Sequence, residues 1–176
     1  MAEIPGNAPL AVAATEASIY AGSFQKRISE LSDGRRDVIG LPCQDFVALC
    51  ESGNISPDDP LLQRAVERYL APARENGSAS LLLGCTHFGI IAEAIRRYLG
   101  DSVKLISAAE CGISAMTAFI EENGIRGTGG SSVYYTSGST EDFDAMAEMI
   151  LSAGKSHSDL RCSCNVHSIA VSPLSY

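Results

Sequence analysis

The sequence lacks long apolar runs and is short of positive charge. No stretch approaches the roughly 20 consecutive apolar residues that a membrane-spanning helix needs. The start, Met1–Pro5, lacks the basic residues and the apolar core of a secretory signal. Lysine and arginine number 13 against 21 aspartates and glutamates, a net charge of −8, which argues against nucleic-acid and anionic membrane surfaces. We therefore expect a cytoplasmic protein with no nucleic-acid or membrane partner.

The six cysteines lack the spacing of a metal site. No two of them form a CxxC pair, and Cys162 and Cys164 are too close together to make a closed zinc site by themselves. His157 and His167 lie near this pair, but the four residues match no standard zinc arrangement. We expect no metal, and free thiols in a reducing compartment.

The chain does contain an alternation of apolar strands and amphipathic helices. Its 176 residues, 45% of them apolar, are enough for one well-buried domain. The alternation predicts an α/β fold, in which a parallel sheet carries helices on both faces. The predicted strands span residues 10–14, 37–41, 80–83, 103–106 and 132–136. The predicted helices span residues 19–31, 43–51, 61–76, 90–99, 108–122 and 140–151.

One segment, Leu81–Ile91, runs from a strand through a cysteine into a helix. Gly84 permits a sharp turn, and a helix is expected just after Cys85. Ligands bind beyond the carboxyl ends of strands in open α/β sheets, and free N–H groups at a helix start favour a thiolate. His87 can exchange a proton at neutral pH. The pattern favours a reactive thiol at Cys85, with core packing as the alternative.

The order of several segments resembles bacterial glutamate racemases of the aspartate/glutamate racemase family. The segment Gly84–Phe88 (GCTHF) resembles their second cysteine motif, and Leu10–Ser18 resembles the strand that leads to their Ala-Thr-x-Gly-Thr loop. The segment Leu41–Gly53 (LPCQDFVALCESG) resembles their Ala-Cys-Pro-x-Phe-Val-x-x-Glu-x-Gly segment. The remaining matches, to the closing strand and to the final strand and helix, are residues 103–107 and 134–150.

This resemblance implies an isomerase that needs no cofactor and interconverts L- and D-glutamate, supplying D-glutamate for peptidoglycan and thus for cell-wall biogenesis and cell shape. Two bases act on opposite faces of the substrate Cα. Carried over residue by residue, Cys85 is one of these bases, His87 assists it, and Glu51 is a glutamate of the catalytic site. Thr86, His87 and Ser18 are then expected to contact the substrate.

The same resemblance implies a division of the chain. Residues 9–106 correspond to the family's second domain, and residues 107–152 to the C-terminal segment that packs with its first domain. Residues 153–176 are expected to form a disordered tail. The family's Cys-Asn-Thr motif, which carries the opposite base, has no counterpart in the sequence. We therefore expect the C-terminal half of a racemase, which lacks part of its site.

No other cysteine takes the place of that opposite base. Cys43, Cys50 and Cys111 lie in segments that match other parts of the family. A chain without the first half is expected to expose apolar side chains and to form oligomers, or to bind a complementing N-terminal half. The side chains expected at this surface are Ile113, Met116, Phe119, Val133, Met146 and Ile150.

Two other functions stay open. One is another member of the aspartate, glutamate and hydantoin racemase group, although His87 and the LPCQDF segment favour glutamate. The other is a half without enzymatic activity that binds a partner chain. A homodimer that places two Cys85 thiols across one site is a variant of this second alternative.

Overall fold

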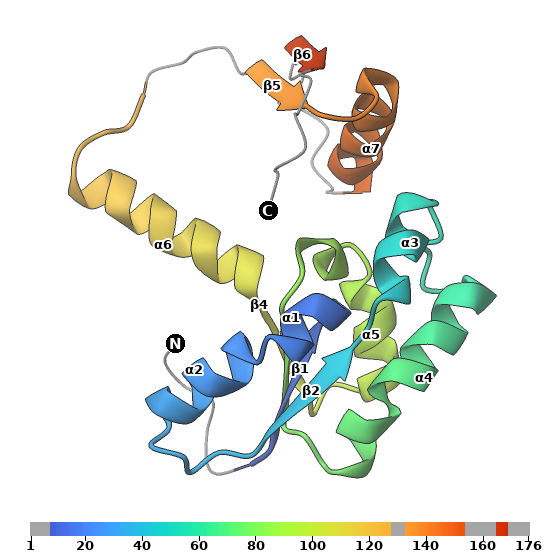
Figure 1. Cartoon of the computed structure of the whole chain (residues 1–176), viewed down its shortest axis with the longest axis vertical. Coiled ribbons are helices and arrows are strands. Elements are labelled where there is room, and N and C mark those ends of the chain that lie inside the picture. The colour runs from blue at the N-terminus through green and yellow to red at the C-terminus, as the bar shows by residue number, and fades with distance from the viewer. Residues whose placement is uncertain (1–7, 128–132, 154–164, 169–176) are drawn as a thin grey trace, which may run out of the picture. The chain divides into compact units, whose positions relative to one another are not determined.

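The computed structural model describes residues 8–127, 133–153 and 165–168 (Figure 1). The segment Met1–Pro5, in which no signal is expected, lies outside them. The chain divides into two units, one up to Phe119 and the other from Ile120. In the described part of the chain, every helix is too short or too polar to cross a membrane.

A four-stranded parallel sheet forms the centre of the first unit. Its strands are β1 (Leu10–Ala14), β2 (Val38–Pro42), β3 (Ser80–Leu83) and β4 (Lys104–Ser107), in the order β2-β1-β3-β4. The predicted α/β fold is confirmed, and four of the five predicted strands form this sheet, with small shifts at some ends. Because every pair is parallel, the carboxyl ends of the strands meet at one edge of the sheet.

The helices of this unit alternate with the strands, as predicted. In chain order they are α1 (Glu16–Tyr20), α2 (Ser23–Leu31), α3 (Asp45–Glu51), α4 (Pro60–Glu75), the 3-10 turn η1 (Thr86–Gly89), α5 (Ala92–Leu99) and α6 (Ala108–Glu122), whose last residues pass into the second unit. Helix α4 begins where the Asp59 carboxylate accepts the N–H groups of Leu61 and Leu62. This is the usual way to satisfy free donors at a helix start.

Two predicted helices differ from the observed ones. The helix expected over residues 19–31 is divided into α1 and α2, because Gly22 adopts a left-handed conformation with φ +68°. The prediction that an α-helix starts directly after Cys85 is wrong. The turn η1 comes first, and α5 begins only at Ala92, because Ile91 has non-helical backbone angles.

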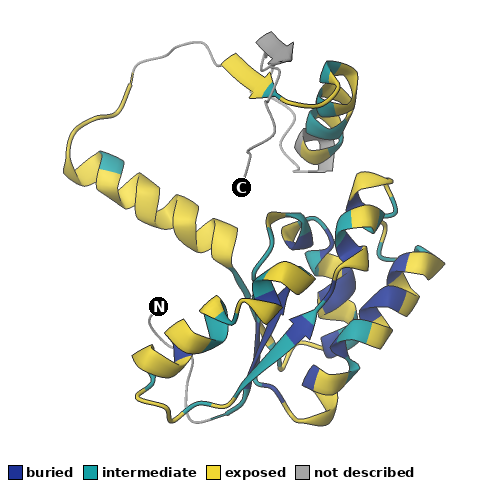
Figure 2. Cartoon of the chain, in the orientation of Figure 1, coloured by how far each residue is buried: buried dark blue, intermediate teal, exposed yellow. Residues whose placement is uncertain are grey.

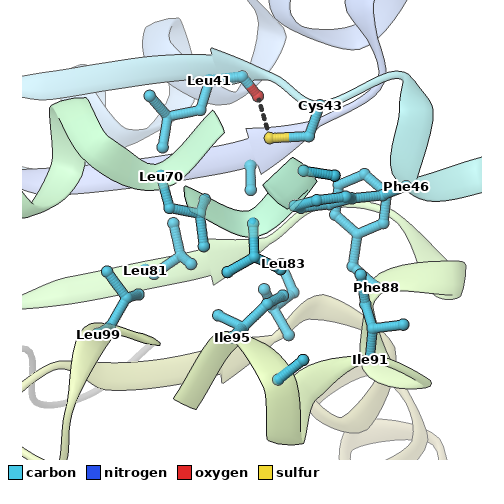
Figure 3. Close-up of a cluster of buried hydrophobic side chains, with 14 of the residues drawn as sticks. Leu41, Cys43, Phe46, Leu70, Leu81, Leu83, Phe88, Ile91, Ile95 and Leu99 are labelled. Atoms are coloured by element: carbon cyan, nitrogen blue, oxygen red, sulfur yellow. Dashed lines mark hydrogen bonds between the residues drawn. The ribbon is translucent and has the colours of Figure 1, made fainter. Parts of the chain in front are cut away.

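Side chains of β1 alternate between the two faces of the sheet. Ala11 and Ala13 join the larger core cluster, whereas Leu10, Val12 and Ala14 join the smaller one. The larger cluster is formed with α3, α4 and α5, and Figure 3 shows its side chains. The smaller cluster is closed by Ile19 of α1 and Ile28 of α2. Helices therefore cover both faces, as predicted.

Helix α6 differs from the other helices of the first unit because none of its side chains is buried (Figure 2). Ile113, Met116 and Phe119 recur every third residue and are each more than half exposed. The expected apolar exposure is confirmed for these three and, in the second unit, for Val133 and Ile150. Met146 is instead partly buried.

The second unit contains α7 (Thr140–Ala153) and a parallel pair of strands, β5 (Val133–Thr136) and β6 (Asn165–Ser168). Strand β6 falls within residues 153–176, where no regular structure was predicted, because its pairing with β5 is not encoded in a local pattern. Apart from β6 and the end of α7, that segment lies outside the described residues. So do His157, Cys162 and Cys164, and the side chain of His167 is not described either.

Candidate active site

The turn after β3 brings Cys85 to the carboxyl edge of the sheet. The Gly84 N–H donates to the Ala13 carbonyl at 2.8 Å. A Cβ atom at Gly84 would lie 3.0 Å from the Phe24 ring and 3.2 Å from the Ala14 side chain, so the close approach of β1 and α2 favours glycine. Cys85 follows in an extended conformation, half-buried, and η1 begins after it.

Three of the predicted site residues form a row at this edge. Cys85 Sγ lies 3.7 Å from His87 Nδ1, and His87 Nε2 lies 3.6 Å from Glu51 Oε1. The His87 side chain is 29% exposed and that of Glu51 is 54% exposed. A carboxylate beside Nε2 favours the tautomer with its proton there. The lone pair of Nδ1 then faces the thiol and can accept its proton.

Helix α3 supplies most of the contacts that hold η1. The Phe46 and Phe88 rings pack edge to face with their centroids 5.1 Å apart, and both are labelled in Figure 3. Cys50 Sγ lies 3.5 Å from the His87 carbonyl oxygen. Glu51, at the end of the same helix, faces the imidazole. Contacts from one helix therefore reach both His87 and the residue after it.

The described thiols differ in their surroundings. Cys43 and Cys50 are fully buried, Cys85 is half-buried, and Cys111 is exposed on α6. Burial raises the pKa of the Cys43 thiol to about 12. Burial, and then the negative charges that Cys85 and Glu51 can carry, raise the pKa of the Cys50 thiol to about 11. Cys43 and Cys50 therefore stay protonated at neutral pH.

The predicted substrate-contact residues lie at two strand ends. Thr86 is exposed at the start of η1, next to Cys85. Ser18 belongs to α1, after β1, and its hydroxyl lies 3.0 Å from that of Thr15, a neighbour that the sequence prediction missed. Thr15 directly follows the apolar run of β1, and this position could have indicated it.

Cys50 was also missed as a neighbour of His87. Its place four residues after Phe46 indicates that the two residues lie on the same side of α3, but the contact itself depends on how α3 packs on η1.

A groove of about 600 Å³ lies elsewhere, between α3 and α4, and contains none of the predicted site residues. An ion pair between Asp45 and Arg68, 2.8 Å long, contributes to its wall. Among the described residues, no group of three histidine, cysteine or acidic side chains is arranged to hold a metal.

Comparison with known proteins points to one family, although no protein-family model matches the chain. The glutamate racemase of Exiguobacterium sibiricum is 32% identical over 141 residues, which cover 78% of this chain and 51% of that protein. The glutamate racemase of Francisella tularensis, solved in complex with D-glutamate, is similar with a TM-score of 0.74 and 25% identity, over 93% of this chain and 57% of that one.

A glutamate racemase isoform from Bacillus anthracis has the same fold, with a TM-score of 0.80 at 22% identity over 96% of this chain and 59% of that one. The chain spans about half the length of the curated relatives it matches. The chain therefore belongs to the glutamate racemase family.

Proposed function

We propose that this chain carries one of the two proton-transfer faces of a glutamate racemase. The observation that supports this most directly is the row Cys85, His87 and Glu51 at the carboxyl edge of a parallel sheet, with separations of 3.7 and 3.6 Å. Ligands of open α/β sheets bind at this edge. A thiol, an imidazole and a carboxylate in this order form an activated nucleophile or base.

In the proposed reaction, His87 first accepts the Cys85 proton, and Glu51 stabilises the imidazolium that results. The Cys85 thiolate then takes the α-proton of glutamate. The Cα–H bond breaks, an S–H bond forms, and the electron pair is delocalised into the substrate carboxylate. Reprotonation from the opposite face inverts the centre. Since the charge remains within the substrate, the reaction requires no cofactor.

Ser18 and Thr86 are proposed to bind the substrate. Their hydroxyls can donate to a carboxylate, and both residues lie near strand ends at the same edge as Cys85. The protein has a net charge of −8, so binding of glutamate, which carries two carboxylates and a net negative charge, depends on such local donors. The aspartate and hydantoin racemases remain alternatives, which rates on glutamate, aspartate and hydantoins would distinguish.

The opposite face needs a second acid. Within the described residues, Cys43 and Cys50 are buried in the core and Cys111 lies on α6, so Cys85 is the thiol that meets an imidazole. We propose that the second acid comes from a complementing N-terminal half or from a second copy of this chain. The D-glutamate product would serve peptidoglycan synthesis in the cytoplasm.

Proton exchange at Cα tests the proposal. The chain is incubated with L-glutamate in D2O, alone and with the half of the Exiguobacterium sibiricum protein that the chain does not match. NMR then measures loss of the α-proton. We expect exchange in the mixture, or in the chain alone where it sediments as an oligomer, with loss of exchange in Cys85→Ala and retention in Cys111→Ser. Equal exchange in the mixture with Cys85→Ala would overturn the role of Cys85, and racemisation by the chain alone while it sediments as a monomer would overturn the half-site.

A binding role without catalysis is the second candidate, and exposed apolar side chains on α6 favour it. In that case the mixture forms a complex, seen by sedimentation, but Cys85→Ala has no effect on any exchange.

A further inference from the structure

We propose that Cys50 is a positioning residue whose buried thiol holds the His87 backbone and so keeps the imidazole between Cys85 and Glu51. This inference rests on the proposed function of Cys85 and His87. Cys50 itself does not meet the substrate, because its side chain is fully buried in the core.

The contact is made to the backbone of the residue that carries the imidazole. Cys50 Sγ donates to the His87 carbonyl oxygen at 3.5 Å. The same oxygen accepts the Ile90 N–H at 3.0 Å, a bond that closes the turn η1. A carbonyl has two lone pairs and can accept both donors. The thiol therefore links α3 to the His87 carbonyl group, the same group whose hydrogen bond closes the turn η1.

Burial keeps this thiol a donor. Its pKa of about 11 leaves the S–H intact at neutral pH, and the negative charges of Cys85 and Glu51 act in the same direction. A neutral Cys50 cannot compete with Cys85 for a proton or an electrophile. A small apolar side chain with a weak donor combines packing in the core with a hydrogen bond to the turn.

The neighbouring contacts of α3 do not replace this one. Phe46 packs on Phe88 with ring centroids 5.1 Å apart, which fixes the residue after His87 (Figure 3). Glu51 faces the imidazole at 3.6 Å, but its side chain is more than half exposed and free to change rotamer. Within the described contacts of α3, Cys50 is the residue that holds the His87 main chain.

Alkylation of Cys85 measures the effect without any need for racemisation. Each variant is treated with iodoacetamide at neutral pH, and mass spectrometry follows the peptide that contains Cys85. We expect Cys50→Val to slow alkylation by about two- to fivefold, since a thiol–carbonyl hydrogen bond is weak. Cys50→Ser, which keeps a donor, is expected to retain the wild-type rate.

Cys43→Val is the matched control. Cys43 is also a fully buried thiol that donates to a carbonyl, that of Leu41 at 3.3 Å, but it does not touch His87. Its replacement is expected to leave the Cys85 rate unchanged. Circular dichroism checks that both valine variants fold, and Cys50→Ala against Cys43→Ala replaces the pair if one does not.

His87→Ala separates the two proposals. If it slows Cys85 alkylation while Cys50→Val does not, the positioning role of Cys50 is overturned and the proposed function stands. If His87→Ala has no effect, the proposed activation of Cys85 fails and the role of Cys50 fails with it. Slow alkylation in Cys50→Ser equal to that in Cys50→Val would also reject the hydrogen bond as the cause.

Discussion

Glu51 Oε1 lies 3.6 Å from His87 Nε2, although the two residues belong to separate elements, α3 and η1. The other ring nitrogen of His87 faces Cys85 Sγ at 3.7 Å. The imidazole therefore lies between a carboxylate and a thiol. This arrangement allows the carboxylate to influence the thiol without touching it.

Replacement of Glu51 by glutamine tests this influence. Glu51→Gln keeps the size of the side chain but removes the charge that stabilises a protonated imidazole. We expect iodoacetamide to alkylate Cys85 about two- to fivefold more slowly, a small effect because the pair is partly exposed. Glu93→Gln on α5 is the control, since Glu93 pairs with Arg96 and Arg97. An unchanged rate in Glu51→Gln, or an equal loss in Glu93→Gln, would contradict the expectation.

The turn before Cys85 gives a second prediction. Gly84→Ala places a Cβ 3.0 Å from the Phe24 ring, so the ring or its surroundings must give way slightly. We expect a loss of about 1–3 kcal/mol in the free energy of unfolding, the usual cost of overpacking, measured by urea denaturation.

The matched control for this change is Gly89→Ala, four residues past Cys85. A Cβ at Gly89 meets nothing within 4 Å, and its φ is not in the left-handed region. It is expected to be neutral or slightly stabilising. Equal destabilisation by the two variants would show that close packing at Gly84 is not the cause.

The sequence predicts the strands and most helices well because their patterns are local. Leu81 and Leu83 lie in a short apolar run bounded by turn residues, and the helix that follows has apolar positions at helical spacing. The division at Gly22 is less predictable, since a glycine inside a helical pattern can be tolerated or can adopt a left-handed conformation.

The site is only partly encoded in local pattern. Cys85 and His87 are two residues apart, and the strand-end position suggests chemistry. Glu51 enters the prediction only through a family resemblance, because the contact with His87 requires that α3 pack on η1. Cys50 shows the same difficulty, since its hydrogen bond joins α3 to a backbone atom of η1.

The apolar face of α6 gives a third prediction. Ile113 and Phe119 are each more than half exposed, and such patches promote association. We expect the chain to sediment as oligomers at micromolar concentration and the double variant Ile113→Gln/Phe119→Gln to shift toward monomer. Leu61→Gln, which removes an exposed leucine of α4, is the control and should have no effect. A monomeric wild-type chain would rule out association through α6.

The buried thiols give a prediction about alkaline stability. In the unfolded chain they titrate near the usual value of 9.0, whereas in the folded chain the pKa is about 12 for Cys43 and about 11 for Cys50. Below pH 9 both states keep the protons, so the thiols do not make stability depend on pH. Between pH 9 and 11 the unfolded state releases protons that the folded state retains, and the free energy of unfolding falls.

The slope of the free energy of unfolding against pH approaches about 1.4 kcal/mol per pH unit for each thiol. A variant without one of these thiols lacks the contribution of that thiol to the slope. Urea denaturation under reducing conditions at pH 8 and at pH 10.5 measures this slope for the wild type and for Cys43→Val. Because all other groups titrate alike in the two proteins, we expect the valine variant to lose less stability over this range. Cys111→Ser is the control, since Cys111 is exposed and its replacement should leave the wild-type slope. An equal slope in Cys43→Val and the wild type would mean that Cys43 does not retain its proton in the folded chain.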